Sequence, residues 1–427
     1  MKNNFRLLRE KWMANRWVKT FIVFLSVFGP ATITAMADND ASGVATYSIA
    51  GALLGYPILF LLMVITLLLG VTQEMGMRLT LVTRRGLADL IREKYGVRVS
   101  LFIFGGLLIA NLGTIVVDLA AVNTTSEMLG IPSIPFLLAV LILTFAFITW
   151  GNYKLTQNIM LIVCLFYFAY IFSAVKAKPD WGLALSNLVF PNGVTWTGKY
   201  ILNYLVVGMG VLGTTITPWG QFFISSFAFD KKMDKNTLKY SQFETYWGAF
   251  LTNFFSFFMI IATAATLYVH GIQLTSGDEA ALAIKPFAGE LASTLFAYGI
   301  LAAGFMGIVI VSLSTAYAFS EFFGLSGSLD ADFRKSKTFY TLFLAQLIIS
   351  ALILLIPGAS LFNLAIASQV LNAMMLPLIF NYLIRLTNDK TIMGGHANSR
   401  FQKYFAVTCT VVILIASVFT VAALFGL

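Results

Sequence analysis

Long apolar stretches, separated by short polar ones, fill the chain from about residue 20 to its end. A helix that crosses a bilayer needs about 20 mostly apolar residues, and eleven stretches approach or exceed that length, two of them with polar interruptions. Their approximate bounds are 20–50, 57–77, 100–128, 134–150, 156–175, 200–228, 242–268, 290–322, 339–356, 361–386 and 404–426. The longest gaps hold about 20 residues, well below the roughly 50 of a small folded domain. The pattern predicts an all-α polytopic membrane protein of eleven transmembrane helices, with no soluble module attached.

Composition supports the same environment. Apolar residues make up 59% of the 427 residues before glycine is counted, and charged residues make up 11%, against about 25% in ordinary soluble domains. Too few polar side chains remain to cover a water-soluble particle of this size. A soluble enzyme, a nucleic-acid-binding protein and a disordered scaffold are therefore excluded. Cys164 and Cys409 lie inside apolar stretches, which excludes a disulfide framework, and we expect no resident cofactor.

The basic residues indicate how the chain sits in the membrane. With eleven spans, 24 of the 28 Lys and Arg residues fall on the same side as the amino terminus. Cytoplasmic loops carry an excess of Lys and Arg, so we expect a multi-pass inner-membrane protein with a cytoplasmic amino terminus and an extracytoplasmic carboxyl terminus. The net charge of +9 is then a consequence of topology and does not indicate a nucleic-acid partner.

Two carboxylates interrupt the first apolar stretch near its middle. Asp38 and Asp40 stand two residues apart in the segment DNDASG at 38–43. A charge at the bilayer centre costs about 2.5–3.5 kcal/mol on insertion scales, and Asp, Asn, Ser and Gly are poor helix formers. Irregular backbone is tolerated at membrane depth only where it is buried in protein or lines a cavity. We therefore expect the first span to unwind here around a polar cavity.

The sixth stretch carries a second interruption. Residues 208–221 read GMGVLGTTITPWGQ, and Pro218 cannot donate to the helical ladder. The two interruptions occupy matching places in two five-span halves, and the odd number of spans makes these halves inverted relative to each other. Paired breaks of this kind are the best sequence pointer to the central site of a transporter. The expected organisation is an amino-terminal tail (1–19), two inverted repeats (20–175 and 200–386) and an extra span (404–427).

The residues at the two breaks favour a cation. No Lys or Arg lies near Asp38 or Asp40 in the first span, and His270 and His396 both fall in loops. Carboxylates, backbone carbonyls, a Gln amide and threonine hydroxyls form an all-oxygen ligand set that suits hard cations. We expect Asp40 to bind the ion. An alternative role for Asp38 is to cap the broken helix without touching the ion.

Several segments resemble the NRAMP divalent-metal transporters. The first span matches from Gly29 to Tyr56. Further matches are GLADL at 86–90, VDLA at 117–120, GILAAG at 299–304, SQV at 368–370 and LP at 376–377. The resemblance covers nearly the whole chain. It implies a fold of eleven or twelve helices with the inverted five-helix repeat of sodium/amino-acid symporters and discontinuous helices 1 and 6.

The first span departs from the family pattern in a specific way. An Asp-Pro-Gly-Asn motif supplies an Asp and an Asn ligand in the family. The matching positions here are Asp40, Ala41, Ser42 and Gly43, so the Asp is kept and the Asn ligand is lost. The resemblance implies that loss of this side chain leaves room at the site.

The sixth and third spans also depart from the family. The family has a Met ligand and, two residues later, a His, where this chain has Thr217 and Trp219. Thr214 replaces a small residue whose carbonyl helps to bind the ion. In the third span Asp118 is kept, but Ala121 replaces a Glu implicated in proton movement. Asp118 is therefore either a remnant of the proton route or a structural polar contact.

These departures change the expected substrate. A thioether favours manganese, iron or cadmium over hard ions, so Thr217 removes that discrimination. Mg²⁺ gives up water reluctantly and is usually held through one or two carboxylates with several waters kept. The pattern resembles the NRAMP-related magnesium transporters, which implies import of partly hydrated Mg²⁺, and also Mn²⁺, by alternating access without proton coupling. The candidate metal-site residues are Ala37, Asp38, Asp40, Gly43, Thr214, Thr217 and, from the family alone, Gln369, for which packing is the alternative role.

Three other functions remain possible from the sequence. A proton-coupled Mn²⁺/Fe²⁺ transporter of the main family branch would take cadmium or iron far better than magnesium. A sodium-coupled amino-acid symporter on the same fold would have to place a substrate carboxylate near Asp38 and Asp40, which repel it. A non-transporting membrane sensor would need an output domain that this chain does not show. The sequence leaves the oligomeric state open, and a monomer is compatible with it.

Overall fold

The described part of the chain is built from helices and contains no strand. The computed structural model describes residues 29–128, 130–272, 274, 280, 285–286, 289–331, 333–356 and 361–424. The expected amino-terminal tail and the start of the first span, up to residue 28, lie outside the described residues.

Five membrane-crossing units make up the first half of the chain. The first unit is a broken pair of helices, α3 and α4, and the fifth is α9 and α10, which a short 3-10 turn joins. Two short helices, α6 and α11, lie in the connections. The bounds are α3 Pro30–Ala37, α4 Ala41–Leu54, α5 Ile58–Thr83, α6 Leu87–Tyr95, α7 Val97–Met128, α8 Ser133–Trp150, α9 Tyr153–Val163, α10 Phe168–Lys176 and α11 Trp181–Ser186.

The second half repeats this scheme and adds one helix. Its first unit is again a broken pair, α12 and α13, and α20 follows the fifth unit. The bounds are α12 Gly198–Thr215, α13 Pro218–Asp230, α14 Leu238–Thr263, α16 Glu290–Phe323, α17 Lys337–Leu354, α18 Leu361–Asn388, α19 Lys390–Met393 and α20 Arg400–Leu424. Among the described residues, 10 helices or joined helices are long and apolar enough to cross a membrane. The broken α3–α4 pair supplies the remaining span of the eleven that the sequence predicts.

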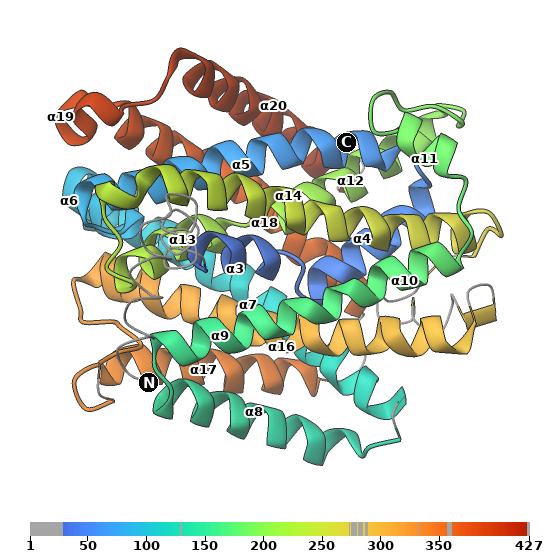
Figure 1. The fold of residues 1–427 in the computed structure, drawn as a ribbon, viewed down its shortest axis with the longest axis horizontal. Helices are drawn as coiled ribbons and strands as arrows, with labels where there is room; N and C mark the ends of the chain where they lie inside the picture. Colours follow the sequence, from blue (N-terminus) through green and yellow to red (C-terminus); the bar gives the residue numbers. More distant parts are fainter. Residues whose placement is uncertain are drawn as a thin grey trace, which may run out of the picture.

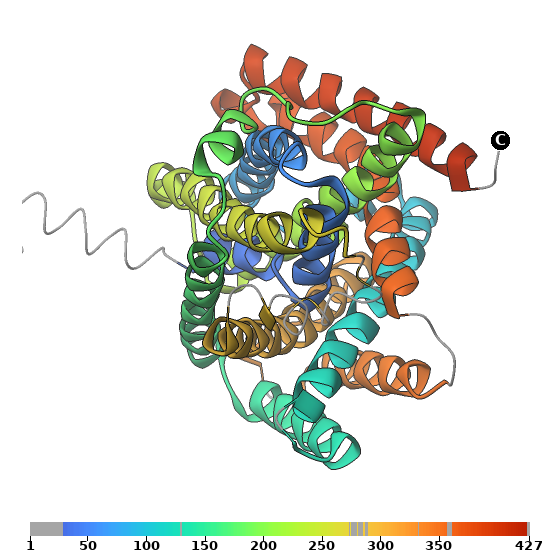
Figure 2. The same cartoon turned by 90° about the vertical axis from the view of Figure 1, so that its right-hand side faces the viewer.

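The broken helices lie inside the bundle. α14 packs against both α3 and α4, and α12 packs against α4 and α18. α8 and α20 lie at opposite edges in both views (Figures 1 and 2). Within the most apolar stretch of each helix, 17% of the residues are buried in α8 and 22% in α20, against 72% in the α14 span. The helix breaks are therefore shielded from lipid by the other helices.

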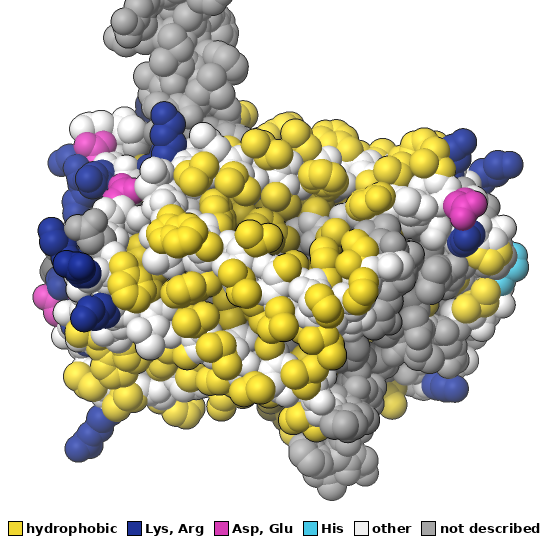
Figure 3. All heavy atoms as spheres, turned by 90° about the horizontal axis from the view of Figure 1, so that it is seen from below, with side chains coloured by type: hydrophobic (Ala, Val, Ile, Leu, Met, Phe, Trp, Pro, Cys, Tyr) yellow, Lys and Arg dark blue, Asp and Glu magenta, His cyan; other side chains and the backbone are white. Residues whose placement is uncertain are grey.

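Apolar side chains cover the middle of the face seen in Figure 3, between two charged ends. Figure 3 shows hydrophobic side chains over the middle of one face and Lys and Arg gathered mainly at the end where α6 and α19 lie. Many large apolar side chains are exposed, including those of Phe102 (72%) and Leu143 (66%). Water disfavours so much contiguous apolar surface, whereas the hydrocarbon core of a bilayer accepts it.

The second predicted span ends at residue 77, which places Arg78 in a polar loop, but the structure shows otherwise. α5 continues to Thr83, and Arg78 is a buried helical residue. Its guanidinium donates to the carboxylate of Glu74 one turn earlier (Nε to Oε1, 2.7 Å) and to Oδ1 of Asn398 (2.7 Å) in the connection before α20. A buried charge is tolerated when it is paired and hydrogen-bonded, so this helix extends beyond its apolar run.

Candidate metal-binding site

The first helix break is a three-residue turn. α3 ends at Ala37 and α4 begins at Ala41. The amide of Asp40 donates to the carbonyl of Ala37 (3.1 Å), which closes the last turn of α3 tightly. The side chains of Asp38 and Asp40 are both buried. The break is shorter than the predicted 38–43, because the residues after Asp40 already form the first turn of α4.

Asp40 and Asp118 share the amino terminus of α4. Oδ1 of Asp40 accepts from the amide of Gly43 (2.7 Å) and the hydroxyl of Ser42 (2.7 Å). Oδ1 of Asp118, on α7, accepts from the amide of Ser42 (3.1 Å). A helix start leaves its first amides without partners and is favourable for negative charge. Asp40 therefore caps α4, and this contact occupies Oδ1 of its carboxylate.

The second break meets the first through one hydroxyl group. α12 ends at Thr215 and α13 begins at Pro218, so Thr217 stands between the two helices. Oγ1 of Thr217 accepts from the amide of Gly220 (3.0 Å), which caps α13, and donates to Oδ1 of Asp38 (2.9 Å). The two breaks, which the sequence predicts in spans 1 and 6, therefore meet through this hydrogen bond.

Close helix packing fills the space around Gly43. A Cβ atom at Gly43 would lie 2.6 Å from the carbonyl oxygen of Asp38 and 2.9 Å from Oγ1 of Thr214. At Gly213, a Cβ atom would lie 1.8 Å from the carbonyl oxygen of Gln369, so α12 reaches α18 only because this residue is glycine. The free space expected beside Gly43 is therefore not present, because the carbonyl of Asp38 and the side chain of Thr214 fill it.

Gln369 reaches the site through Ser42. Nε2 of Gln369, on α18, donates to the hydroxyl of Ser42 (2.6 Å), and Asn372 donates to Oε1 of Gln369 (2.9 Å). Because Ser42 also donates to Asp40, a chain of hydrogen bonds connects α18 to that carboxylate. The sequence did not assign Ser42 a role, although a hydroxyl two residues after a helix-capping Asp is a recognisable signal.

Three further positions predicted from the sequence carry no titratable side chain. Ala37 contributes the carbonyl that closes α3. Trp219 is fully buried in the first turn of α13, and its carbonyl accepts from Ser314 (2.8 Å). Ala121 is buried in α7, almost one turn after Asp118.

Other side chains hold the first turn in place and were not predicted from the sequence. Nδ2 of Asn39 donates to the carbonyl of Thr252 (2.8 Å), and Oδ1 of Asn39 accepts from Ser256 (2.8 Å), both on α14. Nε2 of Gln73, on α5, points to Oδ2 of Asp38 at 3.4 Å. The available signal for Gln73 was its amide in the interior of an apolar span.

The site concentrates negative charge. Asp38, Asp40 and Asp118 are all buried, and the described residues show no Lys, Arg or His side chain hydrogen-bonded or ion-paired to any of them. Within the described ranges, no three His, Cys, Asp or Glu side chains form a cluster that could hold a metal by themselves. Any cation here would therefore also use hydroxyl, amide, backbone or water oxygens.

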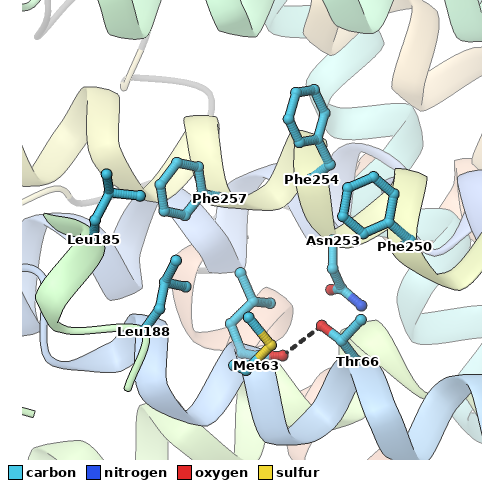
Figure 4. Close-up of a pocket in the computed structure, with 9 residues that line it drawn as sticks. Met63, Thr66, Leu185, Leu188, Phe250, Asn253, Phe254 and Phe257 are labelled. Carbon is cyan, nitrogen blue, oxygen red and sulfur yellow. Dashed lines mark hydrogen bonds between the residues drawn. The ribbon is translucent and has the colours of Figure 1, made fainter. Parts of the chain in front are cut away.

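A separate cavity of about 230 Å³ lies between α5, α11 and α14. Figure 4 shows aromatic and aliphatic side chains around it, with Asn253 and Thr66 as the polar members. The hydroxyl of Thr66 donates to a carbonyl of its own helix (2.7 Å). None of the candidate metal-site residues lines this apolar cavity, which is unsuited to a dication.

Comparisons with known proteins agree with this architecture. The "Divalent metal cation transporter MntH" of Latilactobacillus sakei is 25% identical, over 96% of this chain and 91% of the relative. The structure of the Eremococcus coleocola manganese transporter matches with a TM-score of 0.74 at 18% identity, over 97% of this chain and 90% of that one. MhsT in complex with L-phenylalanine matches with a TM-score of 0.62 at 12% identity, over 92% of this chain and 98% of that one.

The structural matches confirm the predicted fold class, because they extend over nearly the whole chain. A family model described as "Natural resistance-associated macrophage protein-like" matches residues 31–423. This range contains both helix breaks and all of the candidate metal-site residues. The chain belongs to the Nramp family of membrane transporters and is not an enzyme.

Proposed function

We propose that this protein carries divalent cations across a membrane, with Mg²⁺ as its main substrate and Mn²⁺ as a second one. Family membership supports the transport of divalent metals, and the relatives' names and the manganese transporter structure point in the same direction. The proposed site lies at the two helix breaks, where Asp38 and Asp40 meet Thr217. The contact between both breaks is the observation that carries this proposal.

The donor atoms at the breaks favour a hard cation. Carboxylate, hydroxyl and amide oxygens from Asp38, Asp40, Thr217 and Gln369 line the region. Hard oxygen ligands suit Mg²⁺, whereas a soft sulfur ligand would favour later transition metals. Ser42, Gly43 and Thr217 already hydrogen-bond the carboxylates, so an ion that keeps part of its water shell needs fewer of these groups to rearrange.

The proposed import does not require proton coupling. Trp219 and Ala121 occupy positions where the family resemblance implies titratable groups, and neither side chain can exchange a proton near neutral pH. A divalent cation gains about 4.6 kcal/mol in crossing a membrane potential of 100 mV, twice the single-charge value. The potential alone can therefore drive uptake into a cell. Asp118 remains either a structural partner of α4 or a residual proton site.

Liposomes containing the purified protein test this function. We expect Mg²⁺ influx, reported by a trapped magnesium dye, to rise with an inside-negative potential and to leave the reading of a trapped pH dye unchanged. Mn²⁺ is expected to compete, and Cd²⁺ to compete no better than Mg²⁺. Luminal acidification that scales with influx, together with strong preference for Cd²⁺ or Fe²⁺, would instead support a proton-coupled transporter of the main family branch.

The sequence also supports a proposed placement in the cell. We propose an inner-membrane protein with a cytoplasmic amino terminus, because most Lys and Arg residues fall on that side. The boundaries of the two repeats, 20–175 and 200–386, and the extra span 404–427 belong to the same proposal. A sodium-coupled amino-acid symporter is disfavoured, because two buried carboxylates at the first break would repel an amino acid's carboxylate.

A further inference from the structure

Two fully buried glutamines lie beside the joined helix breaks and have unused hydrogen-bonding atoms. Gln73 belongs to α5 and Gln221 to α13, and both side chains are 0% exposed. Oε1 of Gln73 and both amide atoms of Gln221 have no hydrogen-bond partner among the described residues. Buried amide groups are nearly always paired in folded proteins, so three orphaned atoms in one region need an explanation.

Gln73 lies next to Asp38, and Gln221 lies in the first turn of α13, directly after the second break. Nε2 of Gln73 points to Oδ2 of Asp38 (3.4 Å), while Thr217 occupies Oδ1 of the same carboxylate. Gln221 begins the next turn after Thr217, whose carbonyl accepts from its amide (3.4 Å). A Cβ atom at Gly76, almost one turn after Gln73, would lie 3.7 Å from the carbonyl oxygen of Gln221. α5 and α13 therefore bring the two glutamines to a common interface at the break.

A structural role does not account for Oε1 of Gln73 or for the amide group of Gln221. Leaving a buried amide atom unpaired is unfavourable, whereas an apolar side chain of similar size at the same place avoids that cost. Gln346, on α17, differs from Gln221, since its Nε2 donates to the carbonyls of Ser312 and Leu342 (3.3 and 3.1 Å) and only its Oε1 is without a partner among the described residues. Gln221 makes no such contact within the described structure and so gains nothing for the fold.

We propose that Gln73 and Gln221 form the outer part of the ion site and hydrogen-bond water molecules that stay bound to the transported dication. This inference rests on the proposed function. Asp38 would face the hydrated ion together with the two amides, and Asp40 would lie on the opposite side of the turn. Water bound to a dication donates strongly, and Oε1 of either glutamine is a buried acceptor with no other partner among the described residues.

The water shell gives this arrangement its selectivity. Mg²⁺ loses water more reluctantly than most ions of its charge, so it depends most on groups that bind its shell and not the ion itself. Mn²⁺ exchanges that shell for direct ligands more readily. Removing the amides should therefore weaken Mg²⁺ transport more than Mn²⁺ transport.

Replacement of each glutamine by leucine tests the proposal. Q221L and Q73L are compared with Q346L as a matched control, by Mg²⁺ and Mn²⁺ uptake in liposomes and by thermal unfolding in detergent. Each of the first two variants should raise the KM for Mg²⁺ about fivefold, the value of one lost hydrogen bond of about 1 kcal/mol. The KM for Mn²⁺ should change less than about twofold. Q221L should be at least as heat-stable as the parent protein, because it removes two unpaired amide atoms.

The outcomes separate this inference from the proposed function. Absence of Mg²⁺ uptake by the parent protein would contradict the proposed function itself. Parent uptake with an unchanged KM in Q73L and Q221L, or with equal changes for both ions, would overturn only the role of the glutamines. Where a leucine variant does not reach the membrane, the Gln→Asn variant, which shortens the amide arm by one methylene, decides the same comparison through the same ratio of KM values.

Discussion

The Thr217 hydroxyl connects the two broken helices, and its removal gives the sharpest structural prediction. Thr217→Val keeps the shape of the side chain and deletes the hydroxyl. Asp38 then loses a donor at 2.9 Å, and the amide of Gly220 loses its cap at 3.0 Å. A hydrogen bond to a charged group contributes about 1.5–3 kcal/mol, and a helix cap about 0.5–2 kcal/mol. We expect the free energy of unfolding to fall by roughly 2–4 kcal/mol, slightly less than the sum of the two ranges, because both contacts come from one side chain and are not fully additive.

Thermal unfolding in detergent measures this loss. At about 1 °C per kcal/mol for a chain of 427 residues, the melting temperature should fall by roughly 2–4 °C. Thr72→Val is the matched control, because the buried Thr72 hydroxyl donates only to two carbonyls of its own helix (2.9 and 3.3 Å). Thr217→Ser, which keeps the hydroxyl, should retain most of the stability. Equal melting temperatures for the two Thr→Val variants would refute the coupling of the breaks through Thr217.

Three further predictions concern the same region. Glu244→Ala should lower the free energy of unfolding by about 2–3 kcal/mol, because Oε1 of Glu244 accepts from the amides of Gly29 (2.7 Å) and Thr32 (3.0 Å) at the start of α3. Thermal unfolding measures this loss, and an unchanged melting temperature would contradict it. Gly307→Ala should abolish uptake, since its Cβ would lie 2.1 Å from Oδ2 of Asp118, whereas Gly395→Ala, in open space, should leave uptake intact. Thr217→Met should shift competition towards Cd²⁺ by adding a soft ligand, and an unchanged ratio of Cd²⁺ to Mg²⁺ competition would argue against a ligand position there.

Polarity inside apolar stretches predicted the positions of both breaks. Asp38 and Asp40 are costly in a membrane, and Pro218 ends a helix ladder, so these residues marked the turns without knowledge of the fold. The extent of the second break was overestimated. The predicted interruption covers 208–221, but residues 208–215 remain helical, and at Gly213 the absence of a side chain permits close packing against α18.

The partners of the acidic residues could not be predicted in the same way. Gln73 contacts Asp38 in the turn after α3, and Asn39 contacts α14, so both contacts depend on how distant segments pack. Arg78 was expected in a loop, because its pairing with Glu74 becomes visible only when α5 is seen to continue past its apolar run. Local chemistry therefore predicted that Asp38 and Asp40 lie at a helix break, whereas the side chains that hydrogen-bond them could be found only from the three-dimensional arrangement.

One substitution tests the central claim most directly. Asp40→Asn removes a negative charge but keeps an oxygen that can cap α4, because Asn is as good a helix cap as Asp. Asp180→Asn, at the cap of α11, makes the same change away from the breaks. In liposomes we expect Asp40→Asn to abolish Mg²⁺ influx while Asp180→Asn transports at the parent rate. Undiminished Mg²⁺ influx through Asp40→Asn would show that the ion does not depend on this carboxylate, and would contradict the account.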